Sequence, residues 1–369
     1  MQGLRLYLSP FAPDTAGAAA VFFGMDGLVV IVDAGGCAGN IAGFDEPRWE
    51  RGRSAVFSAG LRDMDAIMGR DDRLVEKLRL AAADITAPFI ALVGTPVPAV
   101  IGTDFRALSR LGKKATGLPV VTADCDGTRL YDAGAAKAWL SLFKEFAKPA
   151  AGNNEGKESN APCRGLLGVS PLDFTPAEAA QLLKDHDHQG TTLLYGAAWP
   201  DTAAGSTNQS GPALYTGLNA IRRAAIATEN IVVSAQGLKA ARWLKDRFGT
   251  PYRIDSLLAG YDWQQLSQRH SFSGKEKILL LHESVRALSL QKKMQSELPN
   301  AAISTAGWFM PADELGTPDA RLQEEDEFAS FIQRLAPDII IADRALTRAL
   351  PDYQGTVIDW PHYAVSGAR

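Results

Sequence analysis

Cysteine and histidine are scarce in this sequence of 369 residues. It contains three cysteines, Cys37, Cys125 and Cys163, and five histidines. A small, odd number of cysteines excludes a disulfide framework and is typical of a protein from a reducing cytoplasm. No cysteine or histidine pair has the spacing of a zinc ribbon or a zinc peptidase, so those two classes are excluded as well.

Several motifs and charge patterns are also missing. There is no G-x-x-x-x-G-K-[ST] loop, so we do not expect the chain to hydrolyse ATP itself. There is no G-x-S-x-G nucleophile elbow. The net charge of −4 provides no basic field for nucleic acid or anionic lipid. The apolar run at 16–23 is too short to span a bilayer. We therefore predict a cytoplasmic protein with no membrane or nucleic-acid partner.

The most informative stretch that is present runs from residue 14 to residue 40. Asp14 and Thr15 are good helix N-caps before a small-sided apolar segment. The β-branched run at 28–32 predicts a strand buried on both faces. A glycine-rich turn with Cys37 follows it, at the strand end where α/β proteins bind ligands. Cys37 is thus either a metal or cluster ligand or a small buried cysteine in a tight turn.

Alternating strand and helix patterns continue along the chain and predict an α/β fold with parallel sheets. Strands are predicted at 28–32, 55–58, 89–93, 118–123, 165–169, 191–195, 230–234, 277–282, 301–305, 338–342 and 356–358. Helices are predicted at 17–23, 63–67, 71–82, 104–111, 133–147, 176–184, 212–225, 236–248, 284–297, 324–335 and 345–350. The predicted organisation is an N-terminal α/β domain at 1–147, a linker at 148–164, and further α/β domains at 165–272 and 273–369.

The histidines are weaker candidates for a site. His282 lies at the carboxyl end of a predicted strand, and His362 lies near the C-terminus. A neutral imidazole can ligate a metal or carry a proton, but a core or surface position explains either residue too. The Asp-His-Asp-His tract at 185–188 is interpreted as a solvated turn, and His270 as a surface residue.

Several segments, in order, resemble the nitrogenase component 1 family, which includes the catalytic subunits of dark-operative protochlorophyllide reductase and the nitrogenase cofactor-assembly scaffold. The resemblance covers nearly the whole chain. The matching segments are Gly17-Ala18, Gly36-Cys37, 57–69, 94–104, 230–252 and 337–343.

The resemblance implies a fold, a partner and a reaction. The fold would be three Rossmann-like parallel-sheet βαβ domains around a central cleft. The chain would pair with a homologous subunit, as a homodimer or in a heterodimer or heterotetramer, across a shared iron–sulfur cluster. A separate ATP-dependent iron–sulfur reductase would deliver electrons for a low-potential reduction.

The resemblance also implies roles for individual residues. Cys37 would be the metal ligand, and His362 and His282 would be the catalytic proton donors in the cleft. The loops that line the cofactor interface would contribute Gly35, Gly36, Thr95 and Pro96.

The chain departs from the family in its cysteines. A family subunit supplies about three cluster cysteines, whereas here only Cys37 matches a ligand position and Thr95 replaces another. A cluster held by cysteines alone needs about four thiolates. A different partner could supply three of them, or a two-fold dimer could add oxygen ligands such as Asp33 or Asp14, or no cluster is bound. The alternative functions are therefore a non-catalytic scaffold or carrier for a metallocofactor or tetrapyrrole, and a small-molecule binding protein that has lost the cluster.

Overall fold

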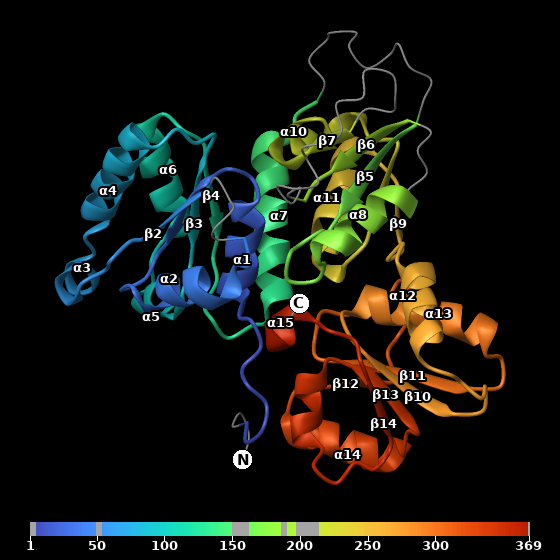
Figure 1. Ribbon diagram of the computed structural model, residues 1–369. Coiled ribbons are helices and arrows are strands. Elements are labelled where there is room, and N and C mark those ends of the chain that lie inside the picture. Colours follow the sequence, from blue (N-terminus) through green and yellow to red (C-terminus); the bar gives the residue numbers. More distant parts are fainter. Residues whose placement is uncertain (1–4, 49–53, 150–161, 186–189, 197–213, 368–369) are drawn as a thin grey trace.

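The computed structural model describes residues 5–48, 54–149, 162–185, 190–196 and 214–367 (Figure 1). They form three parallel sheets with helices packed on them, so the predicted α/β class is confirmed. In Figure 1 the first sheet lies at the left, the second at the upper right and the third at the lower right. We call each sheet with its helices the first, second and third unit.

The first unit has the strand order β2-β1-β3-β4. Its strands are β1 (Leu28–Ile31), β2 (Ala55–Ser58), β3 (Ile90–Val93) and β4 (Val120–Ala123). Its helical segments are α1 (Asp14–Phe23), α2 (Gly36–Asn40), a π-helical turn (Ile41–Asp45), α3 (Asp63–Met68), α4 (Asp71–Asp84), α5 (Pro96–Ile101), α6 (Phe105–Thr116) and α7 (Tyr131–Phe146). β1 and β3 are buried along their whole length, as their β-branched runs predict.

The second unit has the order β7-β6-β5-β8-β9, and the third has the equivalent order β12-β11-β10-β13-β14. Both correspond to the order 3-2-1-4-5, which is that of five of the six strands of a doubly wound Rossmann sheet. The second contains β5 (Cys163–Leu167), α8 (Pro176–Asp185), β6 (Thr191–Leu194), β7 (Leu214–Thr216), α10 (Gly217–Arg222), β8 (Glu229–Val232), α11 (Leu238–Phe248) and β9 (Tyr252–Ile254). Next come α12 (Ala259–Arg269), β10 (Lys277–Leu281), α13 (Ser284–Glu297), β11 (Ala302–Gly307), β12 (Ala320–Arg321), α14 (Glu325–Leu335), β13 (Ile339–Ala342), β14 (Thr356–Asp359) and α15 (Tyr363–Ser366).

Some sequence predictions were wrong. The helix predicted at 212–225 is strand β7 followed by the short α10, with residues 212 and 213 outside the described part. Strands β9 and β12 and helix α12 were not predicted, because the two strands have only three and two residues and the α12 sequence is mostly polar. The segment predicted as a helix at 345–350 is a 3₁₀ helix, Arg344–Ala349. Most of the predicted linker, 150–161, also lies outside the described residues.

The predicted N-caps of α1 were wrong as well. Asp14 and Thr15 are already inside the helix, whose N-cap is Pro13, and no side chain caps it. The buried Asp14 carboxylate instead accepts a hydrogen bond of 2.9 Å from the backbone N–H of Gly127. Asp14 therefore ties α1 to the loop that precedes α7.

The three units do not have one separate hydrophobic core each. One continuous core includes buried residues of both the first and the second unit, with α7 between the two sheets (Figure 1). The third unit has cores of its own on the two faces of its sheet. None of the helices in the described ranges has the length and apolar character needed to cross a bilayer.

Candidate functional site

The turn that carries Cys37 lies where β1 ends and α2 begins. Gly35 has a φ of 129°, a left-handed value that favours glycine, and it turns the chain into α2. Cys37 is half-buried, and burial, followed by the nearby Asp33 charge, raises the pKa of its thiol. The Asp33 carboxylate accepts hydrogen bonds from the Ala38 N–H at 2.9 Å and from the Ser58 hydroxyl at 2.6 Å. Asp33 therefore holds the turn in place with both of its oxygens.

In the second predicted loop, Thr95 and Pro96 differ in their exposure to solvent. Thr95 is fully buried, and its hydroxyl donates to the Val32 carbonyl at 2.8 Å. Pro96 follows it on the surface as the first residue of α5. Thr95 therefore links β1 to β3 inside the unit, whereas Pro96 is accessible.

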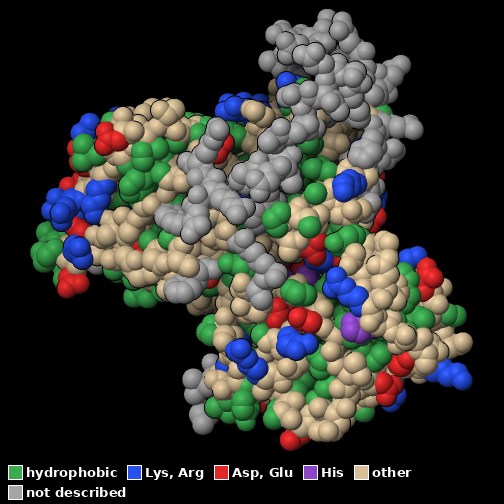
Figure 2. Space-filling model, viewed as in Figure 1, with side chains coloured by type: hydrophobic (Ala, Val, Ile, Leu, Met, Phe, Trp, Pro, Cys, Tyr) green, Lys and Arg blue, Asp and Glu red, His purple; other side chains and the backbone are tan. Residues whose placement is uncertain are grey.

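Large apolar side chains are exposed on the two short helices of this unit. On α3 they are Met64, Ile67 and Met68, and on α5 Val100 is 87% exposed and Ile101 42%. Hydrophobic side chains are visible at the far left of Figure 2, where α3 lies in Figure 1. Exposed apolar groups gathered in this way mark contact surfaces more often than scattered ones do.

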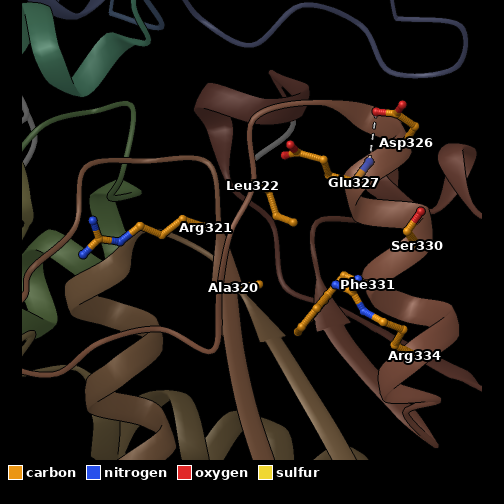
Figure 3. A pocket seen from close by; sticks show the side chains of 8 residues that line it. All are labelled: Ala320, Arg321, Leu322, Asp326, Glu327, Ser330, Phe331 and Arg334. Carbon is orange, nitrogen blue, oxygen red and sulfur yellow. Dashed lines mark hydrogen bonds between the residues drawn. The ribbon is translucent and has the colours of Figure 1, made fainter. Parts of the chain in front are cut away.

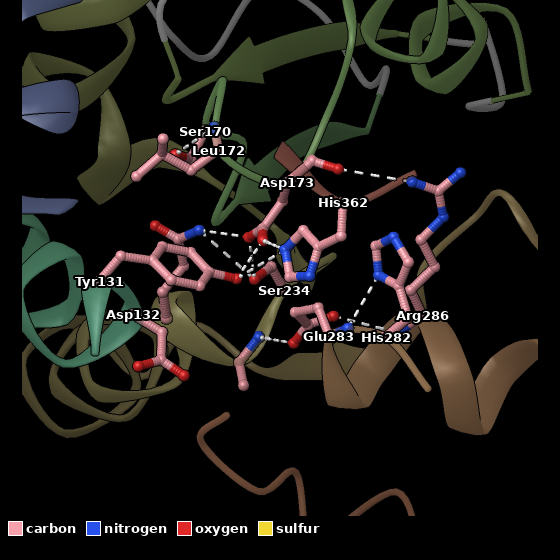
Figure 4. A network of polar contacts seen from close by, with 12 residues as sticks. Tyr131, Asp132, Ser170, Leu172, Asp173, Ser234, His282, Glu283, Arg286 and His362 are labelled. Atoms are coloured by element: carbon pink, nitrogen blue, oxygen red, sulfur yellow. Dashed lines mark hydrogen bonds and ion pairs between the residues drawn. The ribbon is translucent and has the colours of Figure 1, made fainter. Parts of the chain in front are cut away.

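A second group of polar residues lies where the three units meet (Figure 4). Three of them form a triad: Tyr131 at the start of α7, Asp173 in the loop after β5, and His362 after β14. His362 Nε2 lies 3.0 Å from Asp173 Oδ1 and 3.2 Å from the Tyr131 hydroxyl, which itself donates to the same carboxylate oxygen. Each member comes from a different unit and all three are buried.

Further side chains complete the surroundings of the Asp173 carboxylate. Its Oδ2 accepts hydrogen bonds from the Ser234 hydroxyl at 2.8 Å and from the Gln236 amide at 2.5 Å. Both residues follow β8, so the carboxyl ends of β5 and β8 supply one shared network. Burial, followed by the Asp173 charge, raises the pKa of Tyr131 well above its usual value.

His282 is held as a neutral imidazole. Its Nδ1 accepts the Glu283 N–H at 2.8 Å, which leaves the proton on Nε2, 3.3 Å from the Pro361 carbonyl. The ring stacks on His362 with centroids 4.3 Å apart and planes at 18°. Burial, followed by the adjacent His362 and by Arg286, lowers the pKa of His282 well below its usual value.

The Glu283 carboxyl group keeps its proton to a higher pH than an exposed glutamate does. Burial, followed by the Asp173 charge, raises its pKa to about 8, although its carboxyl accepts the backbone N–H groups of Ala235 at 2.8 Å and Arg286 at 3.0 Å. The folded protein therefore retains a proton that an unfolded glutamate loses near pH 4.3.

Because this pKa is raised on folding, Glu283 contributes full stability below about pH 4.3, and the contribution is lost as the pH rises towards about 8. We expect the unfolding free energy to fall between pH 7 and pH 8 with a slope of at most about 1.4 kcal/mol per unit, and Glu283→Gln to remove most of that slope. Urea unfolding at several pH values measures it. Asp132, whose pKa burial raises to about 6, titrates mainly below this window, so the Asp132→Asn variant should keep the slope. An unchanged slope in Glu283→Gln would contradict the assignment.

His362 leaves one atom of the junction without a partner. Its Nε2 faces Asp173, whereas its buried Nδ1 has no hydrogen-bond partner among the described residues. A histidine that ligates a metal commonly has a carboxylate on its other nitrogen, so this geometry fits a bound group at Nδ1. The described residues nevertheless contain no cluster of three or more metal-binding side chains. The chain therefore offers one thiol at its surface and one imidazole nitrogen at its centre, and neither is a complete metal site.

Two cavities in the described part of the third unit differ in size and position. A cavity of about 20 Å³ borders His282, Ser284 and Thr305, and the buried Thr305 hydroxyl has no hydrogen-bond partner in the part of the chain that the structure describes. A larger groove of about 430 Å³ lies at the outer edge of the third sheet, between β12 and α14 (Figure 3). Polar and charged side chains make up most of its lining, and it shares no residue with the junction. Neither cavity is lined by a member of the Tyr131–Asp173–His362 triad.

The remaining cysteines and histidines belong neither to the Cys37 turn nor to the junction. Cys125 is buried, and burial, followed by Asp14, raises the pKa of its thiol far above the usual value. Cys163 is buried at the start of β5. His270 is half-buried at the C-terminus of α12, and His186 and His188 of the Asp-His-Asp-His tract lie outside the described residues.

Sequence reasoning missed most of the junction. Asp173 follows a predicted strand by a few residues, and Glu283 directly follows His282, so strand-end position could have singled out both. Tyr131 and Arg286 had no such signal, because they reach the junction from helices.

The sequence model of the nitrogenase component 1 type oxidoreductases matches residues 13–262, more than half of the chain. This chain belongs to that family. The fold agrees with it. A solved structure titled "Nitrogenase Cp1 at pH 6.5" is similar with a TM-score of 0.69 and 11% identity over 98% of this chain and 87% of that chain. A second, titled "Nitrogenase Cp1 at pH 5", has a TM-score of 0.64 and 14% identity over 100% and 86%. At such identities the likeness concerns the fold.

Proposed function

We propose that this component 1-type chain is a redox subunit that binds one corner of an iron–sulfur cluster through Cys37 and shares that cluster with a homologous subunit. Electrons arrive from a separate ATP-dependent iron–sulfur reductase. The observation that carries the proposal is the state of the three cysteines. Cys125 and Cys163 are buried, whereas Cys37 is half-buried in a glycine turn on a strand end.

The surface around Cys37 supports a subunit contact. A Cβ added at Gly36 or Gly39 would meet no atom within 4 Å, so the turn is open on its outer side. The exposed apolar side chains of α3 and α5 belong to the same unit. The oxygens of Asp33 are already engaged in holding the turn. A partner therefore has to supply the other thiolates, which favours a heterologous subunit over a symmetric dimer.

The residues of the chain have separate tasks in this function. When bound, the cluster supplies low-potential electrons. Asp33 fixes the backbone on which Cys37 is placed. At the junction, Asp173 and Tyr131 hold His362 through Nε2, so that Nδ1 is the nitrogen that can accept or release a proton. His282 stays neutral and stacks on that ring, which fixes its orientation.

Anaerobic purification with iron and acid-labile sulfide assays tests the proposal. The chain co-expressed with its partner is expected to contain iron and sulfide, and Cys37→Ala is expected to lose nearly all of both, because one missing thiolate opens the cluster to solvent. Cys163→Ala is the matched control, since that thiol is buried in β5, and it should retain the cluster. Cluster iron that survives in folded Cys37→Ala would overturn the proposal.

A non-catalytic scaffold or carrier for a metallocofactor or tetrapyrrole is the second candidate. It is favoured by the single thiol that the chain offers, since a carrier has to release its cargo. Reoxidation of the reduced ATP-dependent reductase separates the two functions. A redox subunit accepts its electrons in the presence of ATP, whereas a carrier leaves the reductase reduced.

A further inference from the structure

A small cavity lies at the carboxyl end of the third sheet, where proteins of this strand order bind ligands. It has a volume of about 20 Å³ and is lined by His282 and Ser284, which follow β10, and by Thr305, Ala306 and Gly307 at the end of β11. The two strands are parallel neighbours, so these residues share one end of the sheet. The volume accommodates one water molecule, whereas sites for organic ligands measure about 300 Å³ or more.

The Thr305 residue is fixed beside this cavity. Its backbone N–H donates to the Asp319 carboxylate at 2.7 Å, and its carbonyl accepts the Asp319 N–H at 2.8 Å. The residue is 1% exposed, and its hydroxyl has no hydrogen-bond partner among the residues that the structure describes. Because a buried hydroxyl without a partner is unfavourable, we expect a bound molecule to supply the bond.

Two further polar groups border the same cavity. The Ser284 hydroxyl donates to the Met310 carbonyl at 2.6 Å, so its lone pairs can still accept a hydrogen bond. A Cβ at Gly307 would lie 3.3 Å from the His282 carbonyl oxygen, so the glycine leaves this acceptor uncovered. Most of the remaining lining is apolar, namely Ala287, Leu288, Ala306, Phe309, Pro311 and Pro318. Buried water molecules typically bond to about three polar groups, which is the number available here.

The charges around the cavity exclude an ion. The Glu283 carboxyl accepts the Arg286 N–H at 3.0 Å and so takes the place at the N-terminus of α13 that a phosphate group would need. Arg321, which also lines the cavity, is paired with Asp313 at the surface. A cation would face Arg321 and would find no carboxylate among the described lining residues. The occupant is therefore a neutral molecule that both donates and accepts hydrogen bonds.

We propose that this cavity binds a single water molecule, held by the Thr305 and Ser284 hydroxyls and the His282 carbonyl. The site borders His282, whose ring stacks on His362, so one solvent molecule lies next to the buried junction. Binding of the water requires neither a cluster nor a substrate. It therefore goes beyond the proposed function and can be tested on the full chain alone.

Thr305→Val tests the water by the sign of its effect on stability. Valine has nearly the shape of threonine but lacks the hydroxyl. With a bound water, the variant deprives that water of a partner, and we expect the equilibrium constant for unfolding to rise about tenfold. Without a bound water, valine removes an unpaired polar group, and the constant falls. Urea denaturation of the full chain measures the change.

Thr95→Val is the matched control. Thr95 is similarly buried, but its hydroxyl donates to the Val32 carbonyl, so this variant should lose stability whether or not the cavity binds water. Thr305→Val should shift the urea midpoint in the same direction as Thr95→Val. A shift in the opposite direction would overturn the proposal.

A high-resolution crystal structure locates the water directly. We expect one peak of electron density within about 3 Å of Thr305 Oγ1 in the unsubstituted chain, and none at that place in Thr305→Val. If the unsubstituted chain shows no such peak while other buried waters are resolved, the cavity does not bind water. This measurement decides the question even if Thr305→Val does not fold.

Discussion

Gly134→Ala is expected to destabilise the protein by about 3 kcal/mol or more. Gly134 lies in α7 where α1 crosses it, and a Cβ there would lie 1.8 Å from the Asp14 carbonyl oxygen. Gly17 makes the reciprocal contact from α1, with its Cβ position 1.8 Å from the Tyr131 carbonyl oxygen. Backbone cannot move aside as a flexible side chain can, so the two helices have to separate. Urea unfolding followed by circular dichroism measures the loss.

The control for this prediction is Gly260→Ala. Gly260 also lies in a helix, α12, but a Cβ there would meet no atom within 4 Å. Alanine should stabilise that position by up to about 1 kcal/mol, because it loses less backbone entropy on folding. If Gly134→Ala is as stable as Gly260→Ala, the close helix crossing is wrong.

Arg286→Met is expected to cost about 3–5 kcal/mol of unfolding free energy, because it leaves the Asp262 and Glu178 carboxylates without their cation. Arg286 and Asp262 are 2% and 3% exposed, so water cannot replace the lost charge. Equilibrium denaturation in urea measures the change.

A neutralised triple variant separates burial of charge from loss of packing. Asp262→Asn and Glu178→Gln, added to Arg286→Met, remove the stranded charges and should recover part of the loss. Arg242→Met is the exposed control, since its pair with Glu314 is half accessible, and it should cost no more than about 1 kcal/mol. An Arg286→Met variant as stable as Arg242→Met would exclude the buried ion pair as a stabilising feature.

Local patterns accounted for most of the fold. The β-branched runs at 28–32 and 338–342 are the central strands β1 and β13, because only a sheet covered on both faces buries such continuous apolar segments. The elements that were not predicted depend on their neighbours in the fold, not on a local sequence pattern. The edge strands β9 and β12 are set by their neighbours, and α12 has a mostly polar sequence with Leu266 as a buried apolar contact. No short pattern marks elements of this kind.

The candidate site was predictable where it follows a strand. His282 and His362 are 80 residues apart in the sequence, and each was selected as a candidate on its own. In the structure their rings stack on one another. Their partners Tyr131 and Asp173 come from the other two units, so their contact depends on how the sheets are assembled. The proposed roles of Cys37, Gly35, Gly36, Thr95 and Pro96 remain predictions, as do the predicted domain boundaries.

The shared core of the first two units has a consequence for modularity. The predicted linker at 148–164 follows α7, and on sequence grounds it separates two domains. In the structure α7 packs on α1 on one side and on α11 on the other, with Trp139 and Phe143 fully buried between the sheets. Cutting the chain at the linker would therefore expose the inside of a core. The shared core therefore crosses the boundary that the sequence predicts between the first two domains, and we expect neither part to fold stably without the other.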